Sequence, residues 1–186
     1  MLKDSKGNKR IDIELDEDLV IQLKEVISQG IQKKLSAAKK LIEVDKEVCA
    51  GLYIYSLEEF GKMLLLDDSK SEDNRYKVRY KDEFLNHNVK FGKALDYLEN
   101  HNYNNAIILN DEGGFSSTSY SWRGFTIGLL PKNEARLSIF YADLIQDKED
   151  INKFKIMNIP NINMEILKRA IGELEVALNE YQTQKA

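Results

Sequence analysis

Residues 47–66 read EVCAGLYIYSLEEFGKMLLL, and the apolar side chains of this stretch are spread around every side of a helix. A helix that is apolar all round belongs in the centre of a bundle, because each of its faces needs a neighbour. Between residues 48 and 66 the charged side chains are Glu58, Glu59 and Lys62. The sequence therefore predicts a buried central helix that carries three charges.

Amphipathic helices are expected on both sides of this segment. Asp16 is a suitable N-cap, and the acidic residues that follow it would sit favourably in the first turn of a helix. Before it, residues 11–15 alternate apolar and acidic side chains, as a short strand does. Apolar residues at spacings of three and four predict helices over 16–41, 82–100, 131–145 and 163–181.

The expected fold class is mainly α, a bundle of four to five helices with a short N-terminal strand-like segment. Two prolines and ten glycines in 186 residues favour helices. Residues 102–130 are rich in Asn, Gly and Ser, which predicts an irregular insertion with a hairpin from 106–109 to 125–127. We expect one domain over 1–186, with residues 1–15 as an N-terminal extension.

Composition and charge exclude several classes of protein. The 27 Lys and Arg against 31 Asp and Glu give a net charge of −4, which excludes a globally basic nucleic-acid coat. Cys49 is the only cysteine, so one chain forms neither a disulfide nor a zinc site of several cysteines. No stretch approaches the roughly 20 apolar residues that cross a bilayer. We expect a soluble, cytoplasmic protein with no membrane contact.

Glu58, Glu59 and Lys62 fall within about 100° of each other on a helical wheel, on a face that the apolar residues around them should partly bury. Buried unpaired ions are costly, so these side chains should pair with each other or with a neighbouring helix. Two interpretations stay open. One is an ordinary Glu-Lys pair at a solvated edge, and the other is a functional polar cluster.

The two histidines have different expected roles. His87 lies at the border of the apolar stripe of the 82–100 helix, with Glu83 and Lys90 on the same side. Such a histidine could act as a general acid or base near neutral pH, and the alternative is a packing histidine with a carboxylate partner. His101, at the end of the same helix, is expected to bind the last backbone carbonyls.

Residues 75–81 read RYKVRYK, so cations including Arg79 alternate with aromatic or apolar side chains. Cations hold phosphates and aromatic rings stack on unpaired bases, which suits a single-stranded nucleic acid. Acidic residues flank this segment on both sides and could neutralise it, so a solvated surface is the alternative. The sequence holds neither a Gly-rich phosphate loop nor a His-Glu-x-x-His motif.

Four segments together resemble the AbiV family of abortive-infection proteins. The most specific motif is Glu-Glu-x-Gly-Lys, followed by His-x-x-Lys and by Arg with a later Tyr-x-Asp. The resemblance covers about residues 30–180. The segments are LSAAKKLI at 35–42, YSLEEFGK at 55–62, FLNHNVK at 84–90 and RLSIFYAD at 136–143.

The resemblance implies a HEPN-like helical bundle, frequent dimerisation and a role in defence against phage. It implies action on RNA or on the translation machinery, as a toxin in the infected cell, with no cofactor or metal. An RNA or ribosome-associated target, a phage protein as activator and a second copy in a homodimer are the implied partners. Many HEPN proteins are metal-independent ribonucleases with an Arg four to six residues before a His. Here Arg79 precedes His87 by eight positions, so ribonuclease activity does not carry over by motif.

The residues that match the family motifs would converge on one polar pocket if their helices are neighbours. We expect such a pocket to be either a site for RNA chemistry or a buried ionic lattice that fixes helix register. A non-enzymatic binding module and a helical adaptor that pairs through the 163–181 helix are the alternative functions. The candidate catalytic residues are His87, Glu58, Glu59, Lys62 and Arg136, and the candidate substrate-binding residues are Lys90, Arg79, Tyr141 and Asp143.

Overall fold

The computed structural model describes residues 12–73, 75–79, 84–103 and 164–185, together with the backbone of four short strands between α3 and α5. Helices dominate this part of the chain, as expected. They are α1 (Glu17–Leu41), α2 (Lys46–Asp68), α3 (His87–Asn100) and α5 (Met164–Lys185). The strands are β1 (Asp12–Leu15), β2 (Tyr76–Arg79), β3 (Tyr120–Trp122), β4 (Phe125–Ile127), β5 (Leu144–Gln146) and β6 (Phe154–Ile156).

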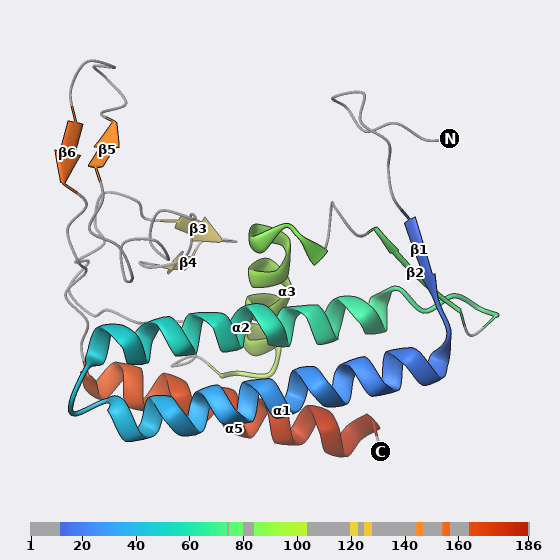
Figure 1. Ribbon diagram of the computed structural model, residues 1–186, viewed down its shortest axis with the longest axis horizontal. Coiled ribbons are helices and arrows are strands. Elements are labelled where there is room, and N and C mark those ends of the chain that lie inside the picture. The colour runs from blue at the N-terminus through green and yellow to red at the C-terminus, as the bar shows by residue number, and fades with distance from the viewer. Residues whose placement is uncertain are drawn as a thin grey trace.

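The helix α2 lies at the centre of the described helices. It packs against α1, α3 and α5, and none of its residues from 46 to 67 is exposed. Figure 1 shows α1, α2 and α5 running side by side, while α3 crosses them. Tyr53, Ile54, Leu57 and Phe60 are fully buried in the shared core. The prediction of a central helix with apolar residues on every face is confirmed.

Local capping explains where the two long helices begin. The Asp16 carboxylate accepts a hydrogen bond from the Leu19 N–H at 2.8 Å, so the predicted N-cap of α1 is confirmed. Asp45 caps α2 in the same way, at 2.9 Å from the Val48 N–H. Sequence reasoning missed this second cap, although an acidic residue just before a long apolar helix is a recognised start signal.

The N-terminal strand has a partner that the sequence analysis did not identify. β1 pairs antiparallel with β2, and Leu15 stands opposite Tyr76. Tyr76 and Val78 are buried on the core side, while Lys77 and Arg79 are exposed. The alternation of apolar residues and cations in 76–79 is thus the two-residue period of a half-buried strand.

One expected helix boundary is wrong. The third helix begins at His87 rather than near residue 82, and the Asn86 carbonyl accepts from the Lys90 N–H at 3.2 Å. Asn directly before a helix favours the N-cap conformation over the helical one. The helix therefore begins after Asn86 and does not extend back to residue 82. Among the described strands, Phe125–Ile127 pairs antiparallel with Tyr120–Trp122. The partner expected for it, residues 106–109, lies outside the described residues.

The helix expected over 131–145 is contradicted at its end. Leu144–Gln146 forms β5, which pairs antiparallel with β6. The backbone here pairs with another strand instead of continuing a helix, because tertiary pairing outweighs local periodicity in a short segment. Residues 131–143 and 106–109 lie outside the described residues.

The apolar stripe of the last helix faces the protein's own core. Its members are buried against α1 and α2, so the stripe considered for pairing with a second copy or another protein packs inside this chain. No helix among the described residues is both long and apolar enough to span a bilayer. The buried members of the stripe are Leu167, Ala170, Ile171, Leu174, Ala177, Leu178 and Tyr181.

Two buried tyrosines, Tyr53 and Tyr181, and the partly buried Tyr97 predict the response of the fold to high pH. Burial raises the pKa of Tyr53, Tyr97 and Tyr181 above the ordinary value of 10.0, and the hydrogen bond from Tyr181 to Asp67 adds to this. Because the folded-state pKa values are raised, the stability linked to them is complete below about pH 10 and is lost as the pH rises above it.

We therefore expect the melting temperature to fall steeply above about pH 10. Tyrosinate absorbance at equilibrium should then show some tyrosines ionising together with unfolding, measured by circular dichroism. Ionisation of all nine tyrosines with the helical signal intact would contradict this expectation.

Candidate functional site

The site is built where α3 crosses α2 at Gly61. A Cβ atom added to Gly61 would lie 1.9 Å from the Lys90 carbonyl oxygen and 2.6 Å from its carbonyl carbon. Only a residue without a side chain allows the two backbones to come this close. The glycine of the Glu-Glu-x-Gly-Lys motif therefore sets the distance between α2 and α3, and it places the charged residues of both helices together.

Three ionisable side chains meet beside this crossing, and we call them the Glu58 cluster: Glu58 from α2 and His87 and Lys90 from α3. The Glu58 Oε2 atom lies 2.6 Å from His87 Nδ1 and 3.4 Å from Lys90 Nζ. The Glu58 and Lys90 side chains are 3% and 5% exposed, whereas the His87 side chain is 32% exposed. The cluster thus has a buried ionic base and a histidine that reaches the surface.

The charges around Lys90 oppose one another. Burial lowers the pKa of the Lys90 ammonium below its ordinary value, and the Glu58 carboxylate acts in the opposite direction. Lys62 lowers this pKa further and Glu59 raises it, so both side chains lie within electrostatic range of the Glu58 cluster. A buried ammonium in this setting depends on Glu58 to remain charged.

Glu59 and Lys62 form an outer pair on the same helix. Lys62 Nζ donates to Glu59 Oε1 at 2.6 Å, and both side chains are 24% exposed. Lys62 thus pairs with Glu59, three residues before it, and not with Glu58, the partner expected four residues before it. Glu58 instead belongs to the buried cluster. The functional roles of these residues stay predictions.

The other candidate residues are placed differently. Arg79 lies on β2, where its register partner is Asp12. Arg136, Tyr141 and Asp143 lie outside the described residues. The described part of the candidate site therefore consists of α2 and α3.

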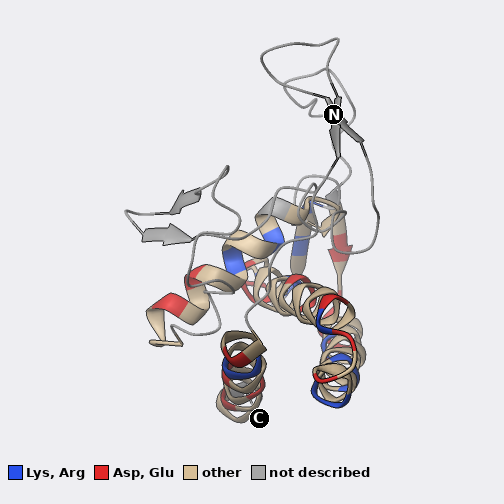
Figure 2. Ribbon diagram, turned by 90° about the vertical axis from the view of Figure 1, so that its left-hand side faces the viewer, with Lys and Arg blue, Asp and Glu red and all other residues tan. Residues whose placement is uncertain are grey.

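The basic segment 75–79 is less suited to binding a nucleic acid than its composition indicates. Tyr76 is 5% exposed, so its ring belongs to the core and is closed to base stacking. The Arg75 guanidinium lies 3.6 Å from Glu14 and 3.8 Å from Asp73. In Figure 2 positive and negative residues are interspersed along the described elements. These observations favour the solvated, locally neutralised surface.

A second concave region, which sequence reasoning missed, lies between α2, α3 and α5. It is a pocket of about 330 Å³, with Asp67, Tyr97, His101 and Tyr181 among its lining residues. Tyr181 donates to Asp67 at 2.6 Å, and the His101 ring stacks on Tyr97. The His101 Nδ1 atom lies 2.8 Å from the Tyr97 carbonyl, which confirms its predicted role at the end of the helix. The lining residues come from distant segments, so no short motif could reveal the pocket.

Cys49 is not suited to nucleophilic chemistry. Its side chain is fully buried, its thiol donates to the Ala38 carbonyl at 3.3 Å, and burial raises its pKa to about 11. Catalytic cysteines need an accessible thiolate. This thiol therefore acts as a small packing residue between α1 and α2.

Within the described residues, no group of three or more His, Cys, Asp and Glu side chains could hold a metal ion. The chemistry available at the Glu58 cluster is proton transfer and ion pairing by its own side chains. Comparison of the chain with protein-family models, with curated proteins and with solved structures finds no match.

Proposed function

We propose that this chain is an AbiV-like abortive-infection protein that acts on RNA, with His87 as its proton-transferring residue. The observation that carries the proposal is the 2.6 Å contact between buried Glu58 and the Nδ1 atom of a partly exposed His87. A carboxylate that accepts a hydrogen bond from Nδ1–H fixes the ring and its tautomer, and Nε2 then serves as the base. The resemblance of residues 55–62 and 84–90 to the AbiV motifs supplies the biological context.

The proposed reaction is RNA cleavage by attack of a ribose 2′-hydroxyl on the adjacent phosphate. It needs a general base and a carboxylate beside that base, which are His87 and Glu58. His87 Nε2 takes the proton of a ribose 2′-hydroxyl, and the resulting oxygen attacks the adjacent phosphorus. The bond from phosphorus to the 5′-oxygen breaks, and this oxygen takes a proton from water. The hydroxide that remains takes the proton from the His87 imidazolium, which restores the neutral base. The products are a 2′,3′-cyclic phosphate and a 5′-hydroxyl end. Glu58 stabilises the imidazolium that forms during the first step.

The lysines have separate roles in this proposal. Lys90 is only 4% exposed and contacts Glu58, so it positions the carboxylate instead of touching a nucleotide. Lys62 is the more accessible cation and would hold a phosphate once it exchanges its partner Glu59. Arg136, Tyr141 and Asp143 keep their expected roles in catalysis and RNA binding, and so does Arg79. A phage protein as activator and a homodimer belong to the same proposal.

The burial of Glu58 and Lys90 supports a second candidate, a non-enzymatic binding module. The Glu58 and Lys90 side chains are 3% and 5% exposed, so they are closed to a macromolecule, and in this candidate the pair fixes α3 against α2. In that case the protein inhibits its target by association. The two candidates differ in whether RNA is cleaved, and in whether His87 is needed for cleavage.

The histidines provide a matched test. We expect His87→Asn to reduce cleavage of a labelled single-stranded RNA at least about 100-fold, because general base catalysis contributes about 10² to 10⁴ in rate. His101→Asn, the control, should cleave like the wild type because His101 lies at the opposite end of α3. Circular dichroism should show the same helical content in all three proteins, and mass spectrometry should find 2′,3′-cyclic phosphate ends.

Two results would reject the enzymatic proposal. One is equal cleavage by the wild type and His87→Asn. The other is no cleavage by the folded wild type together with a lower melting temperature for His87→Asn, which is the outcome expected of the binding module.

A further inference from the structure

One stripe of exposed polar residues on α1 is symmetric in charge about its centre. Asp18 and Glu25 lie seven residues apart on one side of Gln29, and Lys33 and Lys40 lie seven apart on the other. At 100° per residue these five positions fall within an arc of about 80°, on one face of the helix. All five side chains are exposed. We call this face the α1 charge stripe.

We propose that the α1 charge stripe is an interaction surface for a second copy of this chain, with the two α1 helices antiparallel. When two such helices cross at Gln29, the Asp18 carboxylate faces Lys40 of the other copy. Glu25 faces Lys33 of the other copy in the same way. Because the pattern is symmetric, each contact occurs twice, as a two-fold axis requires. Opposite charges at such positions set the orientation and the partner of paired helices.

Within the described residues, the charges of the stripe have no ion-pair partner of their own. Other lysines of α1 do have one, since Lys24 pairs with Asp67 and Lys39 pairs with Glu175. Glu25 accepts only a 3.3 Å hydrogen bond from Gln29, one turn away on the same helix. Lys24 and Lys39 are thus neutralised by other helices of this chain, whereas the part of the chain that the structure describes offers no such carboxylate or cation to the charges of the stripe.

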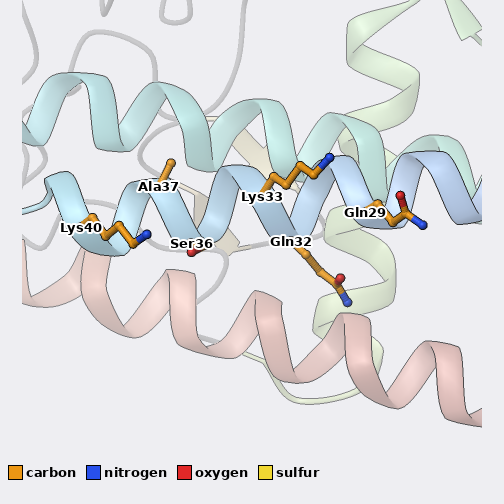
Figure 3. Close-up of a pocket in the computed structure, with 6 residues that line it drawn as sticks. All are labelled: Gln29, Gln32, Lys33, Ser36, Ala37 and Lys40. Carbon is orange, nitrogen blue, oxygen red and sulfur yellow. The ribbon is translucent and has the colours of Figure 1, made fainter.

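The surface also has the shape and the apolar margin that a helix partner needs. A hollow of about 510 Å³ lies along the basic half of the stripe, and α1 alone lines it, as Figure 3 shows. Leu19, Ile21 and Val26 lie beside the acidic half and are 47%, 58% and 66% exposed. Side chains of a neighbouring α1 would fill the hollow and cover these apolar residues.

A nucleic acid is a less suitable occupant of this face. Phosphates would be attracted to Lys33 and Lys40, but Asp18 and Glu25 on the same stripe would repel them. A second α1 in the antiparallel orientation satisfies both halves at once. The interaction does not involve His87, so it stands whether or not the protein cleaves RNA.

Charge reversal tests the surface directly in the full chain. We expect the wild type to be a dimer at low salt, about 0.03 M, and to dissociate toward monomer at about 0.5 M, because exposed ion pairs are screened. The variant Lys33→Glu/Lys40→Glu and the variant Asp18→Lys/Glu25→Lys should each dimerise at least about tenfold more weakly. An equimolar mixture of the two variants should form a heterodimer, because one stripe is then negative and the other positive.

The control variant, Lys77→Glu/Arg169→Glu, lowers the net charge by the same amount as Lys33→Glu/Lys40→Glu, but at positions outside the stripe. It should dimerise like the wild type. Sedimentation velocity measures the wild type, the two stripe variants, their mixture and the control. A wild type that stays monomeric at low salt would overturn the proposal, and so would a wild-type dimer that either stripe variant preserves. A monomer that associates only when a single-stranded RNA is added would assign the stripe to nucleic acid instead.

Discussion

Gly61→Ala is expected to lower the free energy of unfolding by about 3 kcal/mol or more, the range of severe overpacking. The new methyl group would lie 1.9 Å from the Lys90 carbonyl oxygen, and its nearest neighbours are backbone atoms of α3. Backbone atoms cannot rotate away as the end of a side chain can, so α3 itself must shift. That shift would also separate Glu58 from His87 and Lys90. Chemical denaturation followed by circular dichroism measures the effect.

Gly172 supplies the matched control. It lies within α5, and a Cβ atom there would meet nothing within 4 Å. Since alanine is the better helix former, Gly172→Ala should raise the free energy of unfolding by up to about 1 kcal/mol. If Gly61→Ala is as stable as the wild type, the close crossing of α2 and α3 does not exist.

The second large effect is expected for Glu58→Ala. This change leaves the Lys90 ammonium, whose side chain is 5% exposed, without the carboxylate that lies 3.4 Å away. Breaking a buried ion pair by removing one partner costs about 3 to 5 kcal/mol, because the remaining charge is then buried alone. The free energy of unfolding of Glu58→Ala should fall by about this amount at neutral pH.

The neighbouring residue provides the comparison for this variant. Glu59→Ala removes a carboxylate from a pair in which both side chains are 24% exposed, so its loss should be below about 1 kcal/mol. Lys90→Met in the Glu58→Ala background should recover part of the lost stability, because an apolar side chain of similar length replaces the isolated ammonium. Equal losses for Glu58→Ala and Glu59→Ala would contradict the assignment of Glu58 to the buried cluster.

The helical part of the fold could be predicted because it rests on local signals. The stretch 47–66 has apolar residues on every face of a helix, so the helix must be covered on every side, and α2 is covered in this way. Asp16 stands before a long amphipathic helix, and its side chain caps that helix as expected. Such features depend on residues a few positions apart, which a sequence displays directly.

The pairing of distant strands could not be predicted. The sequence analysis treats 75–81 as a basic segment, because β1, the partner of β2, lies about 60 residues earlier in the chain. The described partner of β4 is the near segment Tyr120–Trp122, which the sequence analysis did not identify. A short strand shows its type by alternation, but its partner depends on loop closure and tertiary packing, which periodicity does not report.

The candidate site could be predicted in part. The helical wheel turned Glu58 toward the interior, and it is buried against α3 as that argument implies. The same argument did not separate Glu58 from Glu59, because both lie within one turn and only the position of α3 distinguishes them. The sequence shows Gly61 only as part of a motif. The structure shows why glycine is needed there, because the Lys90 backbone leaves no room for a side chain.

The central claim is that Glu58 and His87 act as one unit, with the carboxylate working through the imidazole. A double-mutant cycle on RNA cleavage, with Glu58→Gln, His87→Asn and the double variant, tests it most directly. We predict that each single variant loses activity and that the double variant is no slower than His87→Asn alone. Cleavage losses that multiply in the double variant, or full activity of Glu58→Gln, would contradict the account.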